Sequence, residues 1–102
     1  MSVATVSLTV PASHPALPGH FPAKPIVPGV VLLGLVHSLA CEQIGFSPGA
    51  TSWRRIKFLQ PVLPEQPVVL ELDGNSDQFS FIIMTTSGGL VARGKCQHVQ
   101  LA

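Results

Sequence analysis

The 102-residue chain is rich in apolar residues, at 46%, and carries charged side chains at only 11% of its positions. Disordered chains are polar and rich in charge, so this composition argues against intrinsic disorder. A formal net charge of +1 gives no electrostatic basis for binding nucleic acid or anionic lipid. The length predicts one domain over residues 1–102, and the low charge predicts apolar surface that another subunit covers.

The N-terminus and the cysteines predict a cytoplasmic protein. The first ten residues lack the basic start and long apolar core of a signal peptide. The apolar stretch 26–40 is interrupted by proline, glycine, histidine and serine, so it is too short and too broken to span a membrane. Cys41 and Cys96 lack metal-binding spacing and are predicted to be free packing thiols rather than nucleophiles, although one disulfide also fits the sequence.

A strand-like pattern opens the chain, and a proline-rich segment follows it. Residues 3–10 alternate between apolar and polar side chains, which predicts a strand. Six prolines between positions 11 and 28 prevent a regular helix there, because each one removes a donor and restricts the residue before it. The bulky histidine and phenylalanine side chains between those prolines favour an ordered loop over a linker.

Residues 29–44 form the one predicted helix. Pro28 suits its first turn, and Gly45 followed by Pro48 ends it. Its side chains are apolar nearly all the way round, which predicts that the helix is buried on most sides. The remaining chain predicts an α+β protein in which one antiparallel sheet curls around this helix, with further strands at 50–62, 68–73, 78–86 and 90–101.

One long motif leads into the predicted helix, and a second lies further along the chain. The first reads Gly19-His20-Phe21-Pro22, then Pro25-Ile26-Val27-Pro28-Gly29-Val30. The second reads Ile56-Lys57-Phe58-Leu59-Gln60-Pro61-Val62-Leu63-Pro64. Together they resemble the (3R)-hydroxyacyl-acyl carrier protein dehydratases, and the chain is also similar to small dehydratase-like proteins of aryl polyene pigment pathways. The resemblance implies a hotdog fold and the dehydration of a 3-hydroxyacyl thioester on acyl carrier protein, with no metal or other cofactor.

The resemblance also implies roles for individual residues. It makes His20 the catalytic base, and it assigns the backbone N–H of Gly29 to the thioester carbonyl. A helix start suits the negative charge that builds on that oxygen, and an imidazole with a pKa of about 6.5 suits proton removal at neutral pH. The residues expected to bind the substrate are Phe21, Ile26, Val27, Val30, Leu33 and Gly34.

Gly34 stands where the resemblance implies a carboxylate. In that family a Glu or Asp in the helix, six positions after the proline of the Pro-Gly pair, helps the hydroxyl leave and comes from the other subunit of a dimer. The next carboxylate here, Glu42, lies about 12 Å further along the helix. A glycine inside a helix costs about 1 kcal/mol relative to alanine, which indicates a need for space. His37 and Ser38 share its helix face, and His37 is the candidate substitute acid.

Three interpretations of the missing carboxylate stay open. His20 acts alone, a related subunit supplies the carboxylate in a homodimer or heterodimer, or the site is inactive and the chain is a non-catalytic partner. A hotdog thioesterase is a further alternative. Those enzymes usually employ Asp or Glu near the helix, so Gly34 argues against it.

Arg54, Arg55 and Lys57 are the candidate docking patch for acyl carrier protein, which is acidic. Ordinary solvated strand charges are an equally good interpretation. Strand alternation predicts that Arg55 and Lys57 share one face and that Arg54 points to the other. The two remaining histidines, His14 and His98, are expected to be structural.

Overall fold

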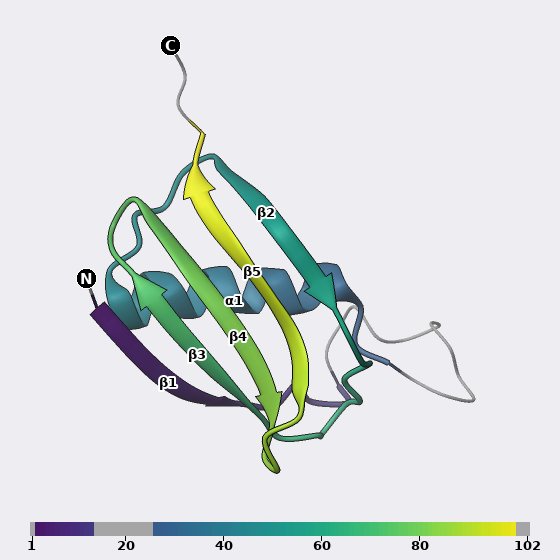
Figure 1. Ribbon diagram of the computed structural model, residues 1–102. Helices are drawn as coiled ribbons and strands as arrows, with labels where there is room; N and C mark the ends of the chain where they lie inside the picture. The colour runs from purple at the N-terminus through teal and green to yellow at the C-terminus, as the bar shows by residue number, and fades with distance from the viewer. Residues whose placement is uncertain (1, 14–25, 100–102) are drawn as a thin grey trace.

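The computed structural model describes residues 2–13 and 26–99. These residues form five strands and one helix (Figure 1). In chain order the elements are β1 (Ser2–Leu8), α1 (Gly29–Ile44), β2 (Thr51–Phe58), β3 (Val68–Gly74), β4 (Gln78–Thr85) and β5 (Leu90–His98).

The bounds of the helix are confirmed, whereas the strands differ from the predictions at their ends. β1 and β4 each end before the predicted residue, and β5 ends at His98, with 100–102 outside the described residues. β2 ends at Phe58 rather than at position 62. The N–H of Leu59 still donates to Val91 O at 2.7 Å, but the chain then turns toward Pro61, which has no N–H for a ladder hydrogen bond.

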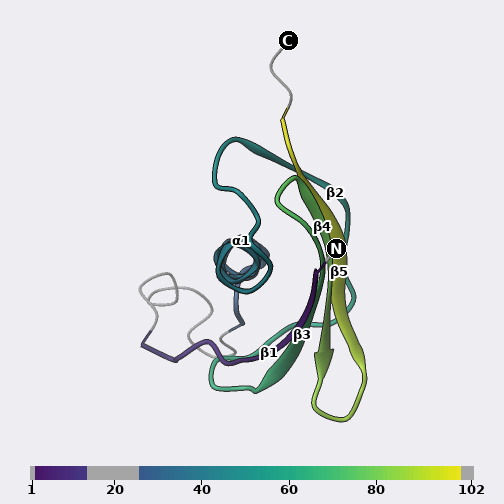
Figure 2. The same ribbon diagram turned by 90° about the vertical axis from the view of Figure 1, so that its left-hand side faces the viewer.

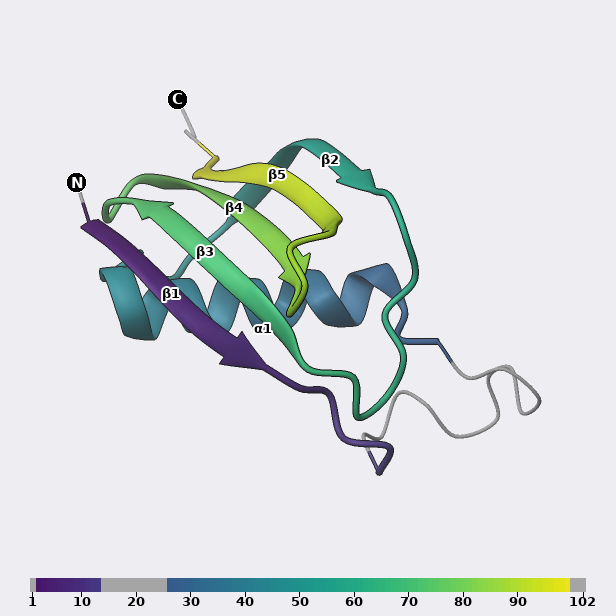
Figure 3. The ribbon, with the colours of Figure 1, turned by 60° about the horizontal axis from the view of Figure 1, so that its bottom comes forward.

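The five strands form one antiparallel sheet with the order β1-β3-β4-β5-β2. The sheet is curved, and α1 lies along its concave side (Figure 2). β1 and β2 are the two edge strands, and they lie at opposite margins of the sheet (Figure 3). The predicted α+β architecture, a sheet curled over one helix, is confirmed.

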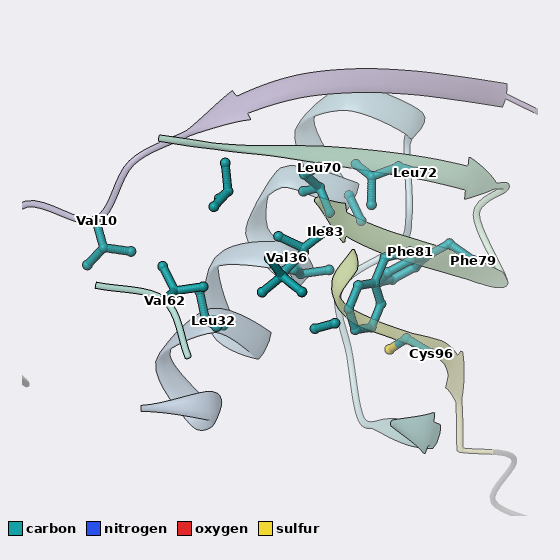
Figure 4. Close-up of a cluster of buried hydrophobic side chains, with 14 of the residues drawn as sticks. Val10, Leu32, Val36, Val62, Leu70, Leu72, Phe79, Phe81, Ile83 and Cys96 are labelled. Carbon is teal, nitrogen blue, oxygen red and sulfur yellow. The ribbon is translucent and has the colours of Figure 1, made fainter. Parts of the chain in front are cut away.

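The core lies between α1 and the concave side of the sheet (Figure 4). On β3 and β4 every second side chain is buried, as expected for strands with one covered face. The helix contributes one stripe of buried side chains spaced four residues apart, which align on a single face. This stripe consists of Leu32, Val36, Ala40 and Ile44.

Among the described residues α1 is buried or half-buried on most sides, as predicted, and one stripe of it is exposed. Val30 is 76% exposed, and Gly34 and Ser38 are also exposed. The sheet curls along one side of the helix (Figure 2), and the side chains that flank the buried stripe are half-buried. The exposed stripe combines one large apolar side chain, Val30, with glycine and polar residues, so its apolar part lies near the start of the helix.

Gly94 on β5 has no side chain, so Ile56 of β2 and Phe81 of β4 pack closely over it. A Cβ at this position would collide with Ile56 Cδ1 and would come within 2.9 Å of Phe81 Cε1. We therefore expect Gly94→Ala to lower the free energy of unfolding by about 1–3 kcal/mol, because overpacking a filled core forces side chains to shift. Urea denaturation of the parent and variant measures the difference.

Gly34→Ala is the matched control for that measurement. A Cβ at position 34 meets nothing within 4 Å, so this variant gains helix propensity without strain and should be more stable by about 1 kcal/mol. A Gly94→Ala protein as stable as the parent would contradict the packing of Ile56 and Phe81 described above.

Candidate active site

Residues 26–30 of the first motif meet the second motif at the start of α1. The N–H of Val27 donates to Val62 O at 2.8 Å, which fastens the end of the first motif to the second. Between them lies a hollow of about 430 Å³. It is lined mainly by apolar side chains: Ile26, Val27, Gly29, Leu32, Phe58, Leu59, Gln60, Pro61 and Val62.

The first turn of α1 borders this hollow, which Gly29 and Leu32 line. Pro28 O accepts hydrogen bonds from the N–H groups of Val31 at 3.0 Å and Leu32 at 3.2 Å, which closes the turn. The N–H groups of Gly29 and Val30 come before any carbonyl within the helix that could accept from them. Together with the positive end of the helix dipole, such groups stabilise a developing negative charge on oxygen.

Phe58 explains sterically why residue 29 is glycine. Its Cζ and Cε2 atoms lie 2.8 and 3.0 Å from the position that a Cβ of residue 29 would take. The ring is 47% exposed and forms one wall of the hollow over the helix start. Phe58 belongs to the second motif, but the sequence does not indicate that it neighbours Gly29, because that contact depends on how the end of β2 reaches the helix.

The predicted site residues divide into three groups. Gly29, Ile26 and Val27 line the hollow at the helix start. His20 and Phe21 lie outside the described residues, so their expected roles stay predictions. The other three, Val30, Leu33 and Gly34, line a second hollow on the uncovered side of α1, about 450 Å³ in volume, together with His37, Gly49, Thr51 and Trp53.

The second hollow leaves room at Gly34 and places His37 beside it. Nothing lies within 4 Å of a Cβ built on Gly34. The His37 ring packs edge-on against Phe46, with the ring centroids 5.5 Å apart, and Phe46 is itself stacked on His98 at 4.6 Å. The space that glycine leaves and the imidazole one turn further along therefore share one cavity.

The basic residues of β2 do not follow simple strand alternation. Arg54 pairs with Lys95 and Lys57 pairs with Arg93, with a register shift between them. At the intervening Arg55, φ is 55°, and this bulge inserts an extra residue into β2. Directly opposed residues point to the same face, so Arg54 and Lys57 share the outer face of the sheet, which corrects the prediction that Arg54 points away from Lys57.

His98 and the cysteines have structural surroundings. His98 Nε2 lies 3.1 Å from Ser76 O, so the predicted structural role of His98 is confirmed, whereas His14 lies outside the described residues. Cys41 and Cys96 are free thiols, as predicted. Burial raises the pKa of the Cys96 thiol above its ordinary value, more than a hydrogen bond with Thr51 lowers it, so Cys96 is a poor nucleophile.

Within residues 2–13 and 26–99, no group of three His, Cys, Asp or Glu side chains is arranged to hold a metal ion. The same part of the chain contains no helix with the combined length and hydropathy that crossing a membrane requires.

Several solved structures share this architecture. The dehydratase heterocomplex ApeI:P from Xenorhabdus doucetiae matches with a TM-score of 0.78 and 23% identity, over 93% of this chain and 85% of that one. The (R)-hydratase from A. caviae involved in PHA biosynthesis matches with a TM-score of 0.68 and 19% identity, over 96% of this chain and 95% of that one. Slr0204, a 1,4-dihydroxy-2-naphthoyl-CoA thioesterase from Synechocystis, matches with a TM-score of 0.61 and 17% identity, over 96% of this chain and 81% of that one. These likenesses show the predicted hotdog fold.

The fold is shared by hydratases, dehydratases and thioesterases, so it does not by itself select an activity. No curated protein is significantly similar to this chain in sequence. The sequence model of the ApeI-like family, described as ApeI dehydratase, matches residues 1–95 and therefore includes both motifs. This match covers nearly the whole chain, which belongs to the ApeI-like family of hotdog dehydratases.

Proposed function

We propose that the chain dehydrates a 3-hydroxyacyl thioester carried by acyl carrier protein, giving the trans-2-enoyl thioester in a polyene-type or fatty acid pathway. Membership of the ApeI-like dehydratase family supports the reaction type. The observation that carries the proposal is that residues 26–29 of the first motif and residues 58–62 of the second line one apolar hollow at the start of α1. An apolar hollow at the start of a helix suits an acyl chain whose carbonyl gains negative charge.

The proposed elimination assigns one step to each group. The N–H of Gly29 donates to the thioester oxygen, and His20 removes a proton from C2. Electrons of the broken C–H bond form the C2=C3 double bond, and the C3–O bond breaks. The leaving hydroxide takes up a proton and departs as water, so atoms and charges balance. The apolar walls of the hollow exclude solvent and strengthen the interaction with the oxygen.

The donor of the proton to the hydroxyl has three candidates. His20 itself returns the proton it took, or His37 supplies one from the hollow that it shares with Gly34. The third candidate is a carboxylate from a related hotdog subunit. In the third case the chain is one half of a composite site and is inactive without its partner.

The exposed stripe of α1, which the sheet of this chain does not cover, favours the half-site alternative. Gly34 offers space without a functional group, and Val30 beside it is largely exposed. The similar ApeI:P structure is a dehydratase heterocomplex. We therefore propose, as the second candidate, a heterodimer in which the uncovered side of α1 faces a hotdog subunit that carries the missing carboxylate.

The deciding experiment measures enoyl thioester formation from a 3-hydroxyacyl thioester by the purified chain, by a hotdog partner with an intact helix carboxylate, and by their mixture. Activity of the lone chain supports the complete enzyme, and a loss of that activity in His37→Gln assigns the proton donor to His37. Activity only in the mixture supports the half-site. The dehydratase proposal would be overturned if neither the lone chain nor the mixture formed enoyl product, or if they released free thiol instead.

A further inference from the structure

Both ends of the segment that contains the predicted base are anchored to the same part of the chain. The segment runs from Val10, after β1, to Val27, before α1. At one end, Val10 O accepts a hydrogen bond from the N–H of Glu65 at 2.7 Å. At the other end, the N–H of Val27 donates to Val62 O at 2.8 Å. Both anchors lie in residues 59–67, which join β2 to β3 and which we call the β2–β3 connection.

The anchors are part of the folded core. Val10 and Val62 are each 1% exposed, and Val27 is 4% exposed. All three belong to the hydrophobic cluster between α1 and the sheet. Because close packing fixes buried side chains, both ends of the segment have defined positions. The direction in which the chain leaves the core after Val10 then depends on the next contact along it.

Glu65 makes that next contact through its side chain. Its Oε1 accepts a hydrogen bond from the backbone N–H of Ala12 at 2.7 Å, which joins residues 53 positions apart. A carboxylate that accepts from a backbone N–H forms a shorter and stronger bond than a neutral acceptor does. With the bond to Val10, Glu65 therefore holds the start of the segment at two points and fixes the direction of the chain there.

The backbone of Glu65 adopts a conformation that favours glycine. Its φ is 67°, in the left-handed region. It is the third residue of a turn that the N–H of Gln66 closes on Leu63 O at 3.2 Å. Proline at the second position, here Pro64, and a positive φ at the third are features of a type II turn, which prefers glycine at the third position. The turn does not need a carboxylate, so the side chain of Glu65 serves a contact outside the turn.

Packing does not explain this glutamate either. Glu65 and residues 11–13 are exposed, so the bond between them buries little apolar surface. A hydrogen bond exposed to water adds little to overall stability, because water competes for both of its groups. The bond does keep the two backbones in one relative orientation. Its benefit is therefore local, at the segment that begins with residue 11.

We propose that Glu65 is a positioning residue, whose carboxylate sets the path of the segment that carries His20; this inference rests on the proposed function. His20 is eight positions after Ala12 and seven before Val27, so it lies near the middle of the anchored segment. Fixing the ends of a loop removes conformational freedom from the residues between them. The β2–β3 connection also lines the hollow at the helix start, through residues 59–62. One connection thus supports both the wall of the hollow and the segment with the base.

The test compares Glu65→Gly with Glu65→Gln, in the chain alone or with its partner subunit, whichever turns over. Glycine suits the turn and removes the carboxylate, whereas glutamine keeps an acceptor oxygen of the same reach. We expect Glu65→Gly to lower kcat for enoyl formation about tenfold and to change KM less than about threefold, because a misplaced base slows the chemical step without weakening substrate binding. Glu65→Gln should keep at least about a third of the parent's kcat, because its bond is weaker but present.

Glu71→Gln is the matched control, because it removes an exposed carboxylate from β3 and should leave kcat unchanged. The urea midpoint of Glu65→Gly should equal that of the parent, since glycine relieves the strained φ while the exposed bond is lost. A fall in kcat that is accompanied by a lower urea midpoint would overturn positioning in favour of a general loss of fold.

Nuclear magnetic resonance separates this inference from the dehydratase proposal, because it needs no turnover. In Glu65→Gly we expect faster hydrogen exchange at the Ala12 amide and a lower ¹⁵N order parameter at the His20 amide than in the parent, with Glu65→Gln close to the parent. These changes support the inference even if none of the proteins forms enoyl product. It would be overturned by equal order parameters at His20 in all three proteins, by equal kcat in the parent and Glu65→Gly, or by a Glu65→Gln protein as slow as Glu65→Gly.

Discussion

Replacing His20 with alanine is expected to lower kcat for enoyl formation by about 10²–10⁴-fold, the usual contribution of a positioned general base. The proposed reaction begins with proton removal from C2, and an imidazole is the group best suited to that step near neutral pH. The hollow beside Gly29 has walls of Ile26, Val27 and Phe58, none of which can accept a proton. The absorbance of the enoyl thioester, followed at saturating substrate, measures the rate.

His14→Ala is the matched control, because His14 belongs to the same proline-rich segment and is expected to be structural. It should keep most of the parent's kcat. The thermal midpoint of each variant shows whether a loss of rate is a loss of fold. A His20→Ala protein that stays folded and turns over within threefold of the parent would remove His20 from the reaction.

Replacing Gly34 with glutamate is expected to raise kcat of the lone chain, by up to about 10²-fold where the missing acid limits the rate. The second hollow has room for the side chain, because nothing lies within 4 Å of the added Cβ. Glutamate is also a better helix former than glycine, by somewhat less than 1 kcal/mol, so the variant should be more stable. Initial rates of the lone chain and of its mixture with a partner subunit measure the effect.

Gly34→Gln separates chemistry from stability in this comparison. It fills the same space and gains similar helix propensity, but it cannot donate a proton as a carboxylic acid can. A gain in rate that glutamine reproduces would show that filling the hollow matters and that a new acid does not. In a His20→Ala background, Gly34→Glu should give no gain, because the base that starts the reaction is missing.

The sequence predicted the elements well where local chemistry determines them. Pro28 and Gly45 mark the bounds of α1, and Gly45 adopts the left-handed conformation, with φ of 71°, that ends helices. Alternating apolar side chains located β3 and β4 because one face of each is buried. The resemblance of the two motifs predicted the fold and the dehydratase family.

Features that depend on distant contacts escaped prediction. No glycine or proline near Arg55 indicates the bulge in the sequence, so strand alternation assigned Arg54 to the wrong face of the sheet. Because α1 is apolar nearly all round, its sequence did not reveal which side the sheet covers. The approach of Phe58 to Gly29 joins residues 29 positions apart, and only the folded arrangement brings them together.

The strand order has a consequence for how the chain folds. β3, β4 and β5 follow one another in sequence and pair with their immediate neighbours, joined by the turns at 75–77 and 86–89. These hairpins need only short loops to close, whereas β1 must find β3 across more than half of the chain. We therefore expect residues 68–98 to assemble first, with the two edge strands and the helix adding afterwards. Substitutions in β1 should then accelerate unfolding and leave the folding rate nearly unchanged.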